Sequence, residues 1–311
     1  MMSSSPKPCE QKPSDLIAPV GPPKYDWAKS RKTLLTGFLV LAALVGIWEF
    51  VHRLGWLWFI LLALFAGVAW FAVGIYTDHL VRQGRYDQAL RLVPLLPMSG
   101  ALRNRVRAES LKEAGRFEEA ERILRENMDR TAGAKLTSVT RVGICFDLED
   151  LGTVLMETGR FEEARQCFRD AAAIFPYHSV SATGLAEALL RQGIFPQSAL
   201  AHVGRALNLF QRGQERIGSG SRLGTILATK AWALAACGHG VEAHEAIDAA
   251  LKSPARKTKG PLAEVHYKVG MSLIALSEHR GAEEHFAWGA KLDPAGRWGR
   301  LCADALRRQS A

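Results

Sequence analysis

Cysteine is scarce in this chain of 311 residues, and its spacing excludes two common uses of the residue. The chain has five cysteines, an odd number with no C-x-x-C pair: Cys9, Cys145, Cys167, Cys237 and Cys302. This pattern argues against a disulfide framework and against a zinc site built from paired cysteines. It favours reduced thiols in a reducing compartment.

Signatures of catalysis and of nucleotide binding are also missing. The chain contains no G-x-x-x-x-G-K-[ST] and no G-x-G-x-x-G. The histidine pairs 239/244 and 279/285 do not have the four-residue spacing of a helical zinc pair. The adjacent glutamates at 118/119, 162/163 and 283/284 recur at one repeat position, which favours a scaffold role. We therefore expect no enzymatic activity, no cofactor and no metal site.

The formal net charge of +9 is a mild excess over a long chain. Arginine mostly alternates with glutamate at helical spacing, as in "RFEEAERILRENMDR" at 116–130. Such alternation is typical of a solvated helix face. The sequence therefore argues against a nucleic-acid partner, which a concentrated basic patch would favour.

Charge is nearly absent between residues 34 and 76. An apolar run at 34–51 and an uncharged run at 56–76 are separated only by "HRLG". Because about 20 apolar residues cross a bilayer, the sequence predicts a transmembrane hairpin over 34–76. A buried core helix would show a polar face, and a cleavable signal peptide would not follow so long a tail. The preceding tail, 1–33, is rich in Ser, Pro and Lys and is expected to be disordered.

Basic residues flank both runs, whereas the turn between them offers only His52 and Arg53. Positive charge is retained on the cytoplasmic side, so both termini and the rest of the chain are expected to be cytoplasmic. An integral protein of a bacterial inner membrane fits this pattern. We further expect one continuous helix from about 56 to 83, which leads out of the bilayer into the following domain.

After residue 76, apolar residues recur at spacings of three and four, which indicates amphipathic helices and no strand. The hexamer "GRFEEA" occurs at 115–120 and 159–164, with "GRYDQA" at 84–89. In the segment 145–178, Gly152 and Ala164 are small enough for two helices to cross. Gly159 suits the turn between the helices, Phe161 suits a wedge in that corner, and Pro176 ends the second helix.

This segment resembles the tetratricopeptide repeat (TPR), a helix–turn–helix unit of 34 residues. The resemblance implies an α-solenoid of five to six units over 77–296, with copies at 101–134, 145–178, 224–257 and 263–296, and a capping helix over 297–311. The residues assigned to its scaffold are Gly115, Phe117, Ala120, Gly152, Gly159, Phe161, Ala164, Phe168, Pro176, Gly193, Phe195, Gly270, Ala282, Phe286 and Pro294.

The repeats are not evenly spaced. Ala89, Ala120 and Ala164 lie 31 and then 44 residues apart, so extra residues must be absorbed around 128–144. A second insertion, around 209–222, is rich in Gly, Ser and Arg and is expected to be a loop. Ser198 stands where the small alanine is expected, one residue before Ala199. An irregular superhelix is therefore expected.

The resemblance also implies a concave groove built from the first helix of each unit. Its groove-facing sites fall on Arg105, Glu109, Lys112, Glu149, Thr153, Met156, Thr183, Glu187, Leu190, Ala228, Trp232, Ala235, Tyr267, Met271 and Ile274. No Asn occurs among them, which argues against the family's clamp for a C-terminal carboxylate. The candidates for partner binding are Arg105, Glu187, Trp232, Tyr267 and Met271. Packing between neighbouring repeats explains Trp232 and Tyr267 equally well.

Together these features predict a membrane-anchored scaffold that binds unidentified protein partners at the cytoplasmic face. Three alternatives remain open. The first is a self-associating membrane platform, the second a binder of anionic surfaces through Arg256, Lys257 and Lys259, and the third an extracytoplasmic assembly factor.

Overall fold

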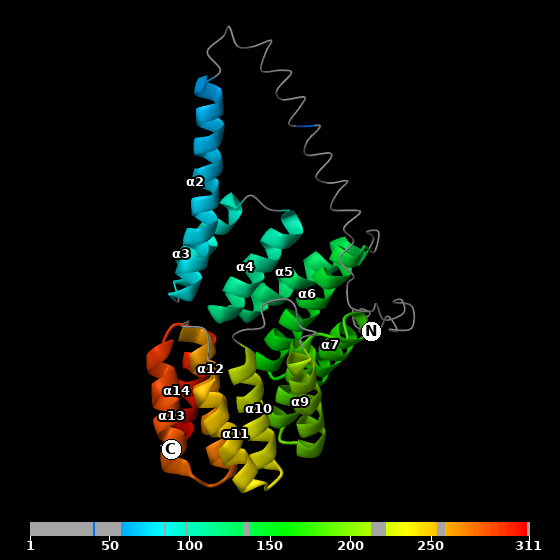
Figure 1. Cartoon of the computed structure of the whole chain (residues 1–311), viewed down its shortest axis with the longest axis vertical. Helices are drawn as coiled ribbons and strands as arrows, with labels where there is room; N and C mark the ends of the chain where they lie inside the picture. Colours follow the sequence, from blue (N-terminus) through cyan, green and yellow to red (C-terminus); the bar gives the residue numbers. More distant parts are fainter. Residues whose placement is uncertain are drawn as a thin grey trace, which may run out of the picture.

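The computed structural model describes Val40 and residues 57–83, 85–96, 99–132, 137–212, 222–253 and 259–309. Every regular element in this part of the chain is a helix (Figure 1). The elements are α2 (Leu57–Arg82), α3 (Tyr86–Leu92), the 3₁₀ turn η2 (Val93–Leu95), α4 (Gly100–Glu113), α5 (Phe117–Ala132), α6 (Ser138–Glu157), α7 (Phe161–Ile174), α8 (Ser179–Gln192), α9 (Pro196–Gln211), α10 (Arg222–Ala236), α11 (Gly240–Lys252), α12 (Lys259–Ala275), α13 (His279–Leu292) and α14 (Arg297–Gln309). The expected all-α solenoid is confirmed.

Successive helices pack as pairs: α4 with α5, α6 with α7, α8 with α9, α10 with α11, and α12 with α13. The turns inside four of these pairs contain Gly115, Gly159, Gly193 and Gly238, with φ between 70° and 82°. In this left-handed conformation glycine avoids the strain of a Cβ atom. Ser277 takes the equivalent conformation between α12 and α13, at φ 63°.

The crossing points within pairs depend on small residues. Ala120, Ala164 and Ala282 have no exposed surface. The ring of Phe168 lies against Gly152 and Gly184, where an added Cβ atom would come within 2.9 Å and 2.4 Å of ring carbons. A Cβ atom added at Gly270 would likewise come within 2.5 Å of a ring carbon of Phe286. At Gly152 and Gly270, which the sequence assigned to the scaffold, the small residue thus allows close approach to an aromatic ring, and Gly184 does the same without having been predicted.

A matched pair of glycine substitutions tests this crossing. Gly184→Ala is expected to destabilise the protein by about 1–3 kcal/mol, because the added methyl group overlaps the Phe168 ring. The Cβ atom that Gly204→Ala adds in α9 has no atom within 4 Å. This change is expected to stabilise the protein by up to about 1 kcal/mol, because alanine has a higher helix propensity than glycine. Urea unfolding of the two full-length variants measures both effects, and equal effects of the same sign would contradict the account.

The expected role of Phe195 is wrong. Phe195 precedes α9, has a left-handed backbone at φ 49°, and is 62 % exposed. Two residues, Ile194 and Phe195, separate the turn glycine Gly193 from α9, whereas Arg160 alone separates Gly159 from α7, so Pro196 begins the helix where Phe161 does. Ala199, rather than Ser198, consequently occupies the buried small site, and Ile194 packs against the core in place of the aromatic.

The irregular spacing of the repeats is absorbed partly by helix length. α6 has 20 residues and begins at Ser138, earlier than the predicted unit, with Thr137 and Thr140 forming a capping box. The predicted loop at 209–222 is helical as far as Gln211, and residues 213–221 lie outside the described residues.

The apolar helix α2 extends away from the repeats (Figure 1). It is continuous from Leu57 to Arg82, as expected for a helix that leads into the first repeat. Its last turns contact α3 and bury Thr77 and Leu80. Several large apolar side chains are more than half exposed along the rest of it: Leu64, Phe65, Val68, Phe71, Ile75 and Tyr76.

The predicted transmembrane hairpin is not supported by the structure. Across the described residues, none of the helices combines the length and the apolarity that crossing a membrane requires. The first predicted span, 34–51, lies outside the described residues except for Val40, as does the tail 1–33.

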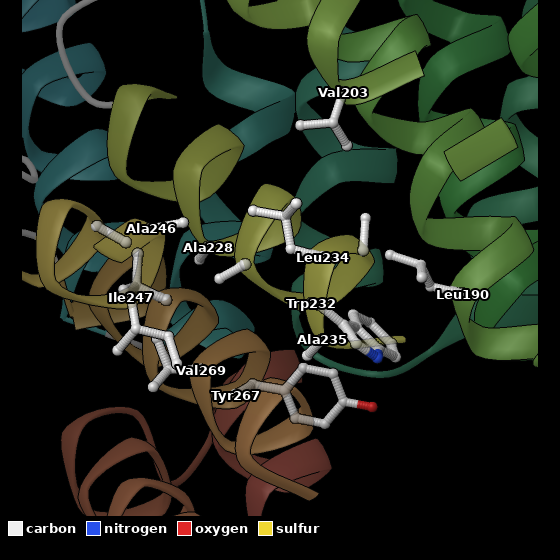
Figure 2. Packing of buried hydrophobic residues seen from close by; sticks show 14 of the residues in the cluster. Leu190, Val203, Ala228, Trp232, Leu234, Ala235, Ala246, Ile247, Tyr267 and Val269 are labelled. Carbon is white, nitrogen blue, oxygen red and sulfur yellow. The ribbon is translucent and has the colours of Figure 1, made fainter. Parts of the chain in front are cut away.

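Most buried apolar residues in the part of the chain that the structure describes belong to two clusters. One surrounds Phe168 and is formed by α4 to α8. The other extends from α8 to α14 and includes Trp232 and Tyr267 (Figure 2). The helix α14 packs on α12 and α13 and buries Trp298 and Cys302 against this second cluster. A helix thus lies where the capping helix is predicted.

Candidate functional site

A pocket of about 230 Å³ lies among the first helices of successive repeats, and we call it the central pocket. It is bounded by α4, α6, α8, α10, α12 and α14. Its lining residues come from these helices and from Phe168 of α7: Lys112, Glu113, Thr153, Met156, Phe168, Ser179, Val180, Thr183, Gly184, Glu187, Arg222, Thr225, Ile226, Glu264, Lys268, Arg297 and Trp298. The lining thus combines apolar surface with four cationic and three carboxylate side chains.

The cationic side chains of the pocket are engaged by the protein itself. Lys268 Nζ lies 2.9 Å from Glu187 and 2.7 Å from Glu264. Arg297 Nε lies 2.6 Å from Glu157 Oε1. Lys112 pairs with Asp150, and Arg222 Nη1 lies 2.7 Å from His178 Nε2. These contacts join helices that are distant in the sequence, so they fix the curvature of the repeat stack.

Glu187 is the centre of this network, which we call the central ion network: Glu157, Glu187, Arg191, Glu264, Lys268 and Arg297. Arg191 lies 2.7 Å from Glu187 and 3.0 Å from Glu157. Burial alone would raise the pKa of Glu187, but Lys268, Arg191 and Arg297 outweigh it and lower that pKa to about 2. The carboxylate is consequently ionised throughout the physiological range.

Five of the predicted groove-facing residues do line the pocket: Lys112, Thr153, Met156, Thr183 and Glu187. Arg105 lies elsewhere, where its Nε is 2.8 Å from Asp147 Oδ1. Met271 and Ile274 are only partly buried and pack on the second core cluster. The pocket is thus at the polar end of the predicted groove.

Trp232 and Tyr267 lie in the interior rather than in the pocket (Figure 2). Their exposed fractions are 4 % and 8 %, and their rings meet edge-on with centroids 6.4 Å apart. Trp298 of α14 lies next to Tyr267, at 5.6 Å between centroids. These contacts are the packing between neighbouring repeats that the sequence left open, and neither ring belongs to the lining of the pocket.

Sequence reasoning missed that α14 closes the aromatic end of the groove. Arg297 and Trp298 both line the pocket, and the guanidinium of Arg297 stacks on the Trp298 ring at 4.2 Å. The available signal was the dipeptide Arg-Trp at the start of a helix otherwise interpreted as a cap.

A second polar cluster lies beside the pocket and contains three groups that are metal ligands in other proteins. A donor atom of each of Cys145, Glu149 and His178 lies within 4.8 Å of the other two, and all three residues are buried. Cys145 and His178 are the first and last residues of one predicted unit, and the helix–turn–helix brings them together. Burial raises the pKa of the Cys145 thiol well above its usual range, which keeps it protonated.

The hydrogen bonds of this cluster suit a network without a metal ion. Arg222 can only donate, so His178 Nε2 accepts and His178 Nδ1–H donates to Glu149 Oε1, at 2.8 Å. The hydroxyl of Ser181 also donates to Glu149. A metal ion on Nδ1 would require the proton to move to Nε2, facing a guanidinium. The arrangement therefore favours a structural role that orients Arg222 toward the pocket.

A pair of histidines between α12 and α13 predicts sensitivity to acid. His266 Nδ1 and His285 Nδ1 are 2.9 Å apart, and burial lowers the pKa of both, that of His266 to about 4. The two histidines take up protons at a higher pH in the unfolded chain than in the folded protein. The free energy of unfolding should therefore fall as the pH drops from 6.5 towards 4. We expect a loss of about 1–2 kcal/mol, after allowing for partial exposure. Urea unfolding across this range measures it, and an unchanged loss in the His266→Gln/His285→Gln variant would contradict it.

Comparisons with known proteins identify the repeats. Models described as tetratricopeptide repeat match residues 105–126 and 148–175. No match to the sequence is found among curated proteins.

Two solved structures share the architecture. A chain of the APC/C hetero-tetramer Cut9–Hcn1 aligns with a TM-score of 0.52 and 19 % identity, over 78 % of this chain and 42 % of its own length. A tetratricopeptide repeat protein from Parabacteroides merdae aligns with a TM-score of 0.51 and 14 % identity, over 91 % of this chain and 97 % of its own length. At such identities the likeness speaks for the fold alone. This chain contains tetratricopeptide repeats, and the part of it that the structure describes is an all-α solenoid of the tetratricopeptide type.

Proposed function

We propose that this chain is a scaffold that binds another protein through the central pocket. Folds of this type suit protein–protein interaction, because successive repeats present one continuous inner surface. The pocket carries the proposal, since it opens on that surface and is lined by the first helices of five repeats. Its charged side chains and its volume of about 230 Å³ suit a single side chain of a partner that carries a polar group better than a large apolar anchor.

The binding surface proposed here differs from the predicted one. Among the five candidates for partner binding, Glu187 lines the pocket, whereas Trp232 and Tyr267 are packed in the core. The partner is accordingly expected to contact Thr153, Met156 and Thr183, with Glu187 acting through the central ion network. Arg105 and Met271 lie outside the lining and are not assigned a contact.

Filling the pocket tests this proposal. Thr153→Trp places a bulky ring in the lining and is expected to abolish recovery of a protein partner captured by the full-length chain. Glu245→Trp adds the same ring to an exposed position on α11 and serves as the control. Equal partner recovery by the two variants, with both folded by circular dichroism, would refute binding through the pocket.

We propose further that residues 34–76 hold the scaffold at a membrane with the repeats on the cytoplasmic side. The uncharged run at 56–76 and the basic flanks support this assignment. The exposed apolar side chains on α2 support it as well, because a stripe of this kind is normally covered. Flotation with liposomes should move the full-length chain, whereas a Phe65→Glu/Val68→Glu/Phe71→Glu variant should remain at the bottom of the gradient.

Self-association is the second candidate, and the same exposed stripe on α2 favours it. A platform of several copies would cover the stripe without lipid. Failure to float, together with a mass of several chains by light scattering, would select self-association over membrane attachment. The anionic-surface alternative stays a prediction, because Arg256 and Lys257 lie outside the described residues.

A further inference from the structure

Two carboxylates at one repeat position have different surroundings. Glu113 ends α4 and Glu157 ends α6, each two residues before a turn glycine, Gly115 or Gly159. Glu157 is held by two arginines of the same chain, Arg297 at 2.6 Å and Arg191 at 3.0 Å. At Glu157, therefore, the protein itself shows a guanidinium bound to a carboxylate at this repeat position.

Glu113 has no such partner among the residues that the structure describes. Its carboxylate lines the central pocket but forms neither a hydrogen bond nor an ion pair within 4 Å with any of them. Only its backbone oxygen is bound, by Arg300 Nη2 at 2.8 Å. Lys112 and Arg297 are near enough to act on the charge of Glu113, yet their own contacts are directed to Asp150 and Glu157.

The position of Glu113 is unfavourable unless a cation approaches. A carboxylate at the C-terminal end of a helix opposes the helix dipole, which favours positive charge there. Burial also raises the pKa of Glu113, because desolvation outweighs the attraction of Lys112 and Arg297. A cationic group in the pocket would relieve both effects.

Resting on the function proposed above, we infer that the central pocket recognises a basic side chain of the partner protein and that Glu113 is its acceptor. An arginine or lysine side chain enters the pocket and binds Glu113 as Arg297 binds Glu157. The other two carboxylates of the lining, Glu187 and Glu264, are already paired with Lys268, so Glu113 is the acceptor left for a basic side chain. Thr153 and Thr183 offer hydroxyl oxygens to the remaining N–H groups.

Two peptides test the preference for a basic side chain. An acetylated and amidated alanine pentapeptide with a central arginine is titrated into the full-length protein, and its central-glutamine counterpart is the comparison. Binding is followed through the methyl NMR signal of Met156, which lines the pocket. The arginine peptide should saturate this signal, and Glu113→Gln should weaken its binding about tenfold or more, the effect of one charge-assisted hydrogen bond.

Two further variants separate binding from folding. Glu118→Gln removes an exposed carboxylate from the start of α5 and should leave arginine-peptide binding unchanged. Glu157→Gln should lower the midpoint of urea unfolding, because it leaves the buried Arg191 and Arg297 with Glu187 as their one remaining carboxylate among the described residues, whereas Glu113→Gln should not lower it. Equal binding of the two peptides, no binding of either, or no loss with Glu113→Gln would overturn the inference. Partner recovery that still depends on Thr153 would then leave the proposed function standing.

Discussion

Replacing Lys268 by methionine is expected to destabilise the protein by about 3 kcal/mol or more. Lys268 has no exposed surface and neutralises Glu187, which is buried, and Glu264, which is partly exposed. Removing one partner of a buried ion pair costs about 3–5 kcal/mol, because the remaining charge is left without compensation. Arg191 and Arg297 still face Glu187, so the lower end of this range applies.

The chain supplies a matched control for this prediction. Lys252 pairs with Asp248 at the same four-residue spacing as Lys268 with Glu264, but its side chain is 75 % exposed. Lys252→Met should therefore change the free energy of unfolding by less than about 1 kcal/mol. The double variant Lys268→Met/Glu264→Gln should recover part of the loss of the single one. Urea unfolding of the four proteins, wild type included, tests the set, and equal losses for Lys268→Met and Lys252→Met would show that the network does not hold the repeats.

Replacing Phe168 by alanine is the second large effect. The ring is 1 % exposed and lies between Gly152 of α6 and Gly184 of α8, so its loss opens a cavity where two repeats meet. Truncation of a buried phenylalanine to alanine costs about 3–5 kcal/mol. Phe195→Ala removes the same atoms from a side chain that is 62 % exposed and should cost less than about 0.5 kcal/mol.

Thermal and urea unfolding compare the two phenylalanine variants directly. Both are expected to remain helical by circular dichroism at low temperature. A loss for Phe195→Ala as large as that for Phe168→Ala would restore Phe195 to the scaffold role that the sequence predicted and would contradict its exposed position before α9.

Local features of the fold were accessible from the sequence because each depends on neighbouring residues. Glycine in a left-handed turn, alanine at a helix crossing and proline after a helix act within a few residues of their own position. Gly159, Ala164 and Pro176 could thus be assigned from one repeat. Phe195 could not, because one extra residue between Gly193 and α9 shifts the start of that helix, and only the packing of Ala199 reveals the shift.

The site was less predictable than the scaffold, for a physical reason. Which residues face the inner surface was implied by the resemblance to the tetratricopeptide repeat, and Thr153, Met156 and Thr183 of that set do line the pocket. Which part of that surface stays open depends on the curvature of the whole stack. Contacts such as Arg297 with Glu157 set that curvature, and their partners are far apart in the sequence. The aromatic end was therefore expected to be open, although α14 covers it.

Site-specific photo-crosslinking at Thr153 tests the central claim most directly. A photoreactive amino acid at Thr153 of the full-length chain, activated in the native cells, should capture a discrete protein partner. The same group at the exposed position Glu245 on α11 should capture none. Capture that occurs at Glu245 and not at Thr153 would contradict a partner site on the inner face of the repeats.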